Sequence, residues 1–302
     1  MKVFHANSLL ERRYSDKIFD AVNIVLMVLV TVIFLWPLWF VVIASISNPI
    51  AVSTGEVLFL PKDITFEGYK EAFKFAALWK GYANTIFVSV VGTALNMVLT
   101  VCCAYPLSVK GFVPGNVVSY FFLVTMYVSG GMIPIYLTVK SVGLLDSTWA
   151  MIIPSAISFY NCLIVRNYFK NSIPGELREA ATLDGAGNFQ YLIKVVLPLS
   201  KPVMAVVGLY YLVGHWNDYR SALLYIYDDN KLPLQSAVRR LMVSVQLLPE
   251  ATVDLEEMGA LFVRSEQMKY CVIILAALPV ICVYPFIQKF FIKGIMIGSV
   301  KG

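Results

Sequence analysis

Charged side chains are scarce in this chain, and their scarcity indicates the class of protein. Asp, Glu, Lys and Arg make up 14% of its 302 residues, whereas a soluble domain carries roughly 25%. The charge-free runs are 21–55, 81–109, 111–139, 147–165, 202–217 and 270–288. Because about 20 apolar residues cross a bilayer, and apolar neighbours extend the shortest run, these runs predict six transmembrane helices. The expected fold class is all-α, a polytopic membrane protein.

A motif for binding ATP is also missing. The chain contains no G-x-x-x-x-G-K-[ST] sequence, and no glycine in it is followed by lysine, which excludes a P-loop. No carboxylate or basic residue lies clearly in the middle of a span, where ion-coupled pumps keep their relay groups. A transporter with this sequence would therefore take its energy from a partner protein.

Catalytic and metal-binding patterns are absent from the sequence as well. The two histidines, His5 and His215, form no H-E-x-x-H pair, and the spans offer no Ser/His/Asp set or paired carboxylates. The five cysteines lie in apolar runs without C-x-x-C spacing, which is typical of small buried hydrophobic residues. We therefore expect no enzyme activity, no catalytic residue, no metal site and no directly bound cofactor.

The charges that remain predict how the spans are oriented. The segments on the N-terminal side of the membrane hold 13 Lys and Arg against 6 Asp and Glu, and the three loops on the other side hold 11 against 13. Because cytoplasmic loops carry an excess of Lys and Arg, both termini are expected in the cytoplasm. Residues 1–20 then form a cytoplasmic segment ahead of a membrane domain at 21–302.

The most informative stretch that is present is a polar segment at 172–198, between the fourth and fifth spans. Ser172 is expected to cap a helix whose first turn holds Pro174. Spacings of three and four residues place four side chains on one face of that helix, with two small alanines in its middle: Leu177, Ala180, Ala181 and Asp184. Gly185 suits the left-handed position that ends a helix. With a second short helix at 188–196, the segment would form a compact cytoplasmic knob.

At this segment the sequence resembles a known family. Glu179-Ala180-Ala181, Gly185, Val195 and Leu197-Pro198 follow the spacing of the EAA motif of ABC importer permeases, with Val195 in place of the usual isoleucine. Other stretches are similar to the carbohydrate-importer branch: Asn84-Thr85, Gly131-Met132-Ile133-Pro134, Gly143-Leu144-Leu145, Trp216-Asn217-Asp218, Tyr284-Pro285-Phe286 and the tail from Gly294 to Gly302. Within that branch the chain resembles the maltose-permease-like group and its LplC/YtcP-type subgroup.

The resemblance implies partners and a coupling site. In this family the EAA helix docks into a separate ATPase, which uses ATP and Mg²⁺, and transmits its closure. The implied assembly has a second homologous permease, two ATPase subunits and an extracytoplasmic solute-binding protein, in the cytoplasmic (inner) membrane of a prokaryote. The expected ATPase-coupling residues are Leu177, Glu179, Ala180, Ala181, Asp184 and Gly185. The subgroup implies a complex oligosaccharide as cargo, including uronic-acid-rich fragments such as those of alginate or pectin.

Sugar contacts are expected from aromatic rings and amide groups, because mostly apolar sites use a few polar groups to orient a ligand. The candidates for the substrate path are Tyr127, Tyr136, Tyr160, Asn161, Tyr210, Tyr211, Trp216 and Asn217. Each has an ordinary alternative role in helix packing or in the aromatic belt of the membrane surface. We also expect a break in the third span at Gly130-Gly131 and Pro134.

The predicted function is that of a permease subunit in an ATP-driven oligosaccharide importer. Two alternatives stay open from the sequence. An ion-coupled secondary sugar transporter would need an ionisable group inside the membrane. A membrane scaffold without transport activity would have no need for a coupling knob with this spacing.

Overall fold

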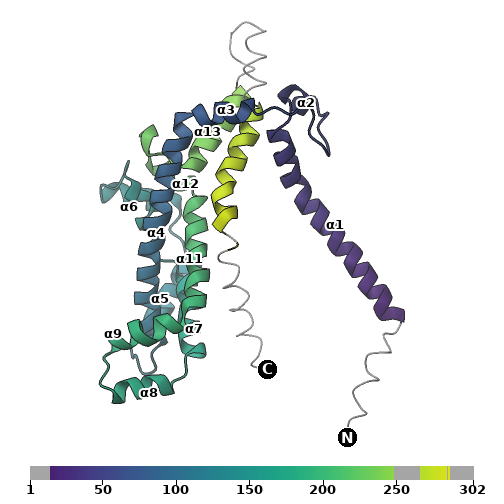
Figure 1. The fold of residues 1–302 in the computed structure, drawn as a ribbon. Helices are drawn as coiled ribbons and strands as arrows, with labels where there is room; N and C mark the ends of the chain where they lie inside the picture. Colours follow the sequence, from purple (N-terminus) through teal and green to yellow (C-terminus); the bar gives the residue numbers. More distant parts are fainter. Residues whose placement is uncertain (1–13, 248–265, 284, 286–302) are drawn as a thin grey trace. The chain divides into compact units, whose positions relative to one another are not determined.

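A computed structural model describes residues 14–247, 266–283 and 285, and throughout this part of the chain the structure is helical, without β-strands (Figure 1). The prediction of an all-α fold is therefore confirmed. The chain divides into two compact units. The first comprises Met1–Ala72 and Leu247–Ile274, and the second comprises Phe73–Gln246 and Leu275–Gly302.

The first unit is held together around one buried glutamine. Its helices are α1 (Tyr14–Ser45), α2 (Pro49–Ser53), α3 (Glu67–Lys74) apart from its last two residues, and the first part of a helix at Glu266–Val283. The side-chain amide of Gln267 donates to the carbonyls of Ser47 (3.1 Å) and Thr65 (3.2 Å) and accepts from the N–H of Gly68 (3.1 Å). Gly68 is required there, because a Cβ would lie 2.9 Å from the glutamine side chain.

The second unit contains most of the remaining helices. They are α4 (Ala76–Ser108), α5 (Gly115–Tyr127), α6 (Met132–Ser141), η1 (Thr148–Met151), η2 (Ile153–Ser155), α7 (Phe159–Ser172), α8 (Glu176–Leu183), α9 (Asn188–Tyr191), η3 (Leu192–Val196), α10 (Leu197–Leu199), α11 (Lys201–Trp216), α12 (Arg220–Tyr225), η4 (Asp229–Lys231) and, apart from its last residue, α13 (Leu234–Leu247). α4 packs along both α7 and α11. Their apolar faces form the largest buried cluster of the unit.

The contact between α4 and α11 also uses small and polar residues. α4 buries a polar row: Thr85, Ser89, Asn96 and Thr100. Thr100 Oγ1 lies 2.8 Å from the hydroxyl of Tyr211 on α11. Gly92 faces the buried ring of His215, and a Cβ at this glycine would lie 2.6 Å from the ring Nε2. Such small residues and interhelical hydrogen bonds are what membrane helices use to approach closely, since lipid offers no hydrophobic gain for association.

Three described helices are long and apolar enough to cross a membrane alone: Phe19–Ser45, Ala76–Ser108 and Glu266–Val283. Three further candidates are bent pairs: Gly115–Tyr127 with Met132–Ser141 (116°), Thr148–Ser155 with Phe159–Ser172 (51°) and Asn188–Leu199 with Lys201–Trp216 (83°). Six spans result if each bent pair is one span, so the number six stays a prediction. The expected break in the third span, between Gly115–Tyr127 and Met132–Ser141, is confirmed. It falls at Gly131, whose φ of +86° is in the region that favours glycine.

Candidate functional site

The polar segment between α7 and α11 begins later than the sequence suggests. α7 continues through Ser172, and α8 starts only at Glu176, after Gly175, which makes no side-chain capping bond. The expectation that Ser172 caps α8 is therefore wrong. Pro174 is the physical reason, because a residue before proline is pushed out of the helical region. Ile173 is accordingly extended, with φ −103° and ψ +118°.

The end of α8 agrees with the sequence analysis. Gly185 has a φ of +77°, as expected for the left-handed residue after a helix. Its N–H donates to the carbonyl of Thr182 (3.0 Å), and the N–H of Ala186 donates to the carbonyl of Ala181 (2.8 Å). This pair of bonds is the Schellman ending, which satisfies carbonyls that the helix leaves free. It reverses the chain into α9, so the expected succession of helix, glycine turn and helix is confirmed.

The second half of the segment is anchored in the body of the unit. Tyr191, Leu192 and Val196 are buried in the same cluster as α4 and α7. The hydroxyl of Tyr105 on α4 donates to the carbonyl of Asn188 (3.0 Å), and the Asn188 side chain accepts from the guanidinium of Arg178 (3.2 Å). These contacts of residues 188–196 form a base that fixes the position of α8. α8 lies with α9 at one end of the unit (Figure 1).

One side of α8 is exposed and partly apolar. Leu177 is 39% exposed and Leu183 is 89% exposed, with the small side chain of Ala180 between them on the same face. Ala181 is partly buried against the cluster of its own unit, and its role in ATPase coupling stays a prediction. Leu183 is a further candidate on this face, and its spacing of three residues from Ala180 is the sequence signal that points to it.

The candidate path residues separate into two groups. Five are exposed or half-buried: Tyr127 at the end of α5, Tyr136 on α6, Tyr160 at the start of α7, Tyr210 on α11 and Asn217 after it. Three are buried: Asn161, Tyr211 and Trp216. The hydroxyl of Tyr211 is engaged with Thr100 and with the N–H of Ser158. A role of any of the eight in the substrate path stays a prediction.

Trp216 has the surroundings of a packing residue. It is 7% exposed, its indole N–H donates to the carbonyl of Ala276 (3.1 Å), and its ring meets that of Tyr82 edge-on at 6.3 Å. We expect Trp216→Ala to destabilise the unit by roughly 3 to 5 kcal/mol, as truncation of a buried Trp does, and to reduce transport in proportion.

The measurement is thermal unfolding and sugar-stimulated ATPase activity on the same purified complex, with Trp216→Phe as the control that keeps a ring beside Tyr82. Unchanged stability with lost stimulation would contradict the packing role and assign Trp216 to the path.

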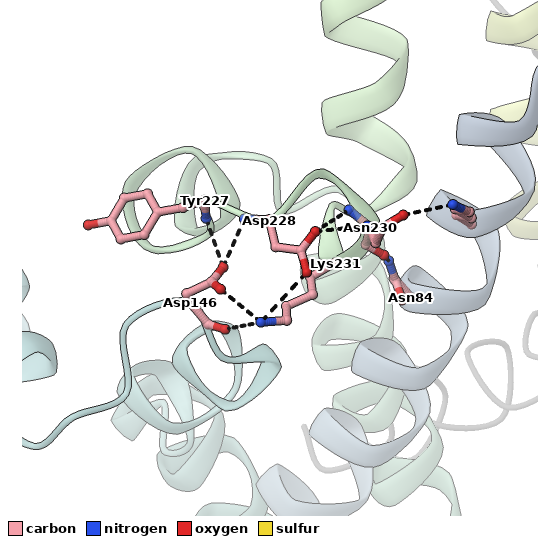
Figure 2. A network of polar contacts seen from close by, with 7 residues as sticks. Asn84, Asp146, Tyr227, Asp228, Asn230 and Lys231 are labelled. Carbon is pink, nitrogen blue, oxygen red and sulfur yellow. Dashed lines mark hydrogen bonds and ion pairs between the residues drawn. The ribbon is translucent and has the colours of Figure 1, made fainter.

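A second polar cluster lies at the other end of α4 (Figure 2). Asp146, a non-glycine residue with φ +56°, accepts hydrogen bonds from the backbone N–H groups of Tyr227 (3.0 Å) and Asp228 (2.9 Å). The ammonium of Lys231 donates to its carboxylate (2.8 Å) and to its carbonyl (2.7 Å). The amide of Asn84 on α4 donates to the carbonyl of Asn230 (2.7 Å). The cluster therefore joins the loops after α6 and α12 to α4.

α4 connects the two polar ends of the unit. Asn84 binds the loop of the second cluster, and Tyr105 binds the segment that carries α8. Along one helix at about 1.5 Å per residue, these two side chains are about 32 Å apart. The hydrocarbon core of a bilayer is about 30 Å thick. The Asp146 cluster and the segment that carries α8 are accordingly bound to α4 at points about one hydrocarbon-core thickness apart.

The charge state of Asp146 makes this cluster insensitive to pH in the physiological range. The Lys231 ammonium, together with the N–H groups of Asp228 and Tyr227, lowers the pKa of the Asp146 carboxyl to about 2. In an unfolded chain the pKa is about 3.9. The contribution of the ionised Asp146 carboxylate to stability is thus complete above about pH 3.9 and is lost as the pH falls through about 2.

We expect Asp146→Asn to lower the melting temperature by the same amount from about pH 5 to pH 8, and by less below about pH 4. Thermal unfolding across this pH range is the measurement. Asp229→Asn is the matched control, because its ion pair with Arg240 is exposed and such pairs contribute little. A difference that grows on acidification would contradict the assignment.

The bent apolar helices and the exposed helical segment between them define a polytopic helical membrane protein. The family described as the binding-protein-dependent transport system inner membrane component matches residues 4–297, and the chain belongs to that family. It is 39% identical to protein LplC of Bacillus subtilis strain 168 over 95% of this chain and 96% of LplC. It is 38% identical to the polygalacturonan/rhamnogalacturonan transport system permease protein YtcP of the same organism, over 95% of this chain and 99% of YtcP.

A solved structure supports the same assignment. It is described as a bacterial ABC transporter involved in the import of the acidic polysaccharide alginate, and one of its chains matches with a TM-score of 0.83 and 35% identity. The match covers 92% of this chain and 98% of that chain. The resemblance found from the EAA spacing is confirmed at the level of the family and of its LplC and YtcP relatives.

Proposed function

We propose that the chain is the membrane-spanning permease subunit of an ABC importer for acidic oligosaccharides. The observation that carries the proposal is α8, an ordered helix with an exposed apolar residue, Leu183, at the end of a transport-family unit. A single large apolar side chain is common on a surface. Leu183 is different, because it lies beside the small Ala180 on a helix that a Schellman turn and a buried base hold in place. An apolar side chain fixed in this way is suited to insertion into a partner.

The partners follow from what the chain lacks. It has no P-loop, so ATP is bound and hydrolysed by separate ATPase subunits that dock on α8 from the cytoplasm. The Asp146 cluster then faces the extracytoplasmic side, where a solute-binding protein delivers the sugar. A second permease of the same family completes the path, and both termini of this chain lie in the cytoplasm, as its Lys and Arg distribution favours.

The substrate class is inferred from the relatives. YtcP is named for polygalacturonan and rhamnogalacturonan, and the structural relative is described with alginate. All three polymers contain uronic acids, so their fragments carry carboxylates on the sugar rings. We infer that this chain passes uronic-acid-containing oligosaccharides of that kind.

We expect the cognate solute-binding protein and the reconstituted importer to prefer oligogalacturonate or oligoalginate over maltodextrins of equal length. We expect a preference of at least about tenfold, which corresponds to a difference of about 1.4 kcal/mol in binding free energy. A site that pairs the carboxylates of the sugar can supply a difference of this size. Calorimetric titration and vesicle uptake with the same panel are the measurements. Tighter binding and faster uptake of the neutral sugars would overturn the acidic substrate class, while leaving the importer assignment intact.

A further inference from the structure

A cavity lies behind α8, and the expected coupling residue Glu179 is part of its lining; an inference about its ligand rests on the proposed function. Its volume is about 380 Å³, within the usual range of about 300 to 1,000 Å³ for small-molecule sites. The last turn of α4, the end of α7, the start of α8 and the region of α9 form its walls. Phe169 and Val196, both nearly inaccessible to solvent, give it an apolar floor.

The charges around the cavity are mostly positive. Lys110, Lys170 and Arg178 line it, against the single carboxylate of Glu179. No ion pair joins either lysine to a carboxylate of the described residues. Arg178 uses one N–H on the Asn188 side chain, and a guanidinium has five. Formally, two positive charges therefore remain for a ligand, and such a site favours an anion.

The position of the lysines indicates where that anion comes from. Lys110 follows the end of α4 by two residues, and Lys170 is two residues before the end of α7. Both helices belong to candidate membrane spans, so we infer that the two ammonium groups are near the level where the spans leave the bilayer. Phospholipid headgroups occupy this level, and basic pockets between transmembrane helices are known to hold them.

We propose that this cavity binds a phosphate group carried by the headgroup of an acidic phospholipid. The two lysines and Arg178 hold the phosphate. Glu179 stands at the same wall, at the first turn of α8, so the occupied cavity fixes the start of the helix that we expect to dock on the ATPase. Anionic lipid would thus strengthen the coupling between α8 and its partner.

The test uses the complete transporter in vesicles of phosphatidylcholine with and without phosphatidylglycerol. We expect phosphatidylglycerol to raise sugar-stimulated ATPase activity in the wild type and to remain bound in native mass spectrometry. At about fivefold per lysine near an anionic surface, Lys110→Gln with Lys170→Gln should weaken lipid binding about 30-fold. Lys194→Gln with Lys201→Gln is the matched control, because neither residue lines the cavity.

Three outcomes separate the possibilities. Loss of the lipid effect in the cavity variant and its retention in the control supports the proposal. An equal lipid effect in both variants overturns it. Stimulation of the wild type by inorganic phosphate in pure phosphatidylcholine, absent from the cavity variant, would overturn the lipid as the source. Since both cavity lysines are exposed, their substitution should leave the melting temperature of the chain unchanged.

Discussion

Replacing Ala180 by arginine is expected to detach the ATPase from the chain while its spans still insert. Ala180 lies on the exposed face of α8, between Leu177 and Leu183. A small side chain there lets a partner approach the helix closely, and the two leucines supply apolar area on either side. Arginine at this position would hold the surfaces apart and place a charge in a desolvated contact, which is costly unless it is paired.

We expect a loss of at least about 2 kcal/mol of docking free energy, the size of an interface hot spot, and hence about a 30-fold weaker association. Copurification of the ATPase and sugar uptake in vesicles are the measurements. Thr182→Arg adds the same bulk and charge to the opposite face of α8, so this variant should retain both ATPase copurification and sugar uptake. Full copurification and uptake in Ala180→Arg would sink the assignment of this face.

Ala181→Arg should behave differently from Ala180→Arg. Ala181 is partly buried against the cluster that contains Tyr191 and Val196, so a long charged side chain would disturb the base of the segment. We expect a lower melting temperature of the chain itself together with loss of the ATPase. This contrast distinguishes a contact with the partner from a contact that supports α8.

Uptake should fall to the level of protein-free vesicles when either ATP or the solute-binding protein is omitted. The chain has no nucleotide-binding loop and no Asp, Glu, Lys or Arg clearly in the middle of a span, so its sequence indicates neither common energy source. Proteoliposomes containing both permeases and the ATPase are the system, with ATP and Mg²⁺ on the side that carries α8. Labelled oligogalacturonate inside the vesicles is the measured quantity.

The control for this experiment is a proton or sodium gradient imposed without ATP. An ion-coupled secondary transporter would accumulate sugar under that gradient, whereas an importer driven by a partner ATPase would not. Accumulation with the gradient alone would favour the secondary transporter and remove the reason for a docking face on α8.

Local chemistry made several features predictable from the sequence. The break at Gly131 and the end of α8 at Gly185 both need a positive φ, which glycine adopts without strain, and the structure has both. The start of α8 was mispredicted at Ser172, because the effect of Pro174 on the residue before it outweighs the preference of serine for a cap.

The sequence by itself determined the class of protein, since charge-free runs, the missing P-loop and the EAA spacing are properties of residue order and composition. Which side of α8 is available to a partner was decided only by the tertiary structure. Helical periodicity puts Ala180 and Ala181 100° apart on one broad face, and only packing against the buried cluster turns Ala181 inward.

The Asp146 cluster and the cavity behind α8 depend on tertiary structure for the same reason. Asp146 meets Lys231 across 85 positions of sequence, and Lys110 shares a cavity with Lys170 because α4 and α7 pack together. No periodicity or motif in the sequence predicts such contacts between distant residues. They arise from how the helices pack, which depends on the combined shapes and polar groups of residues distant in sequence.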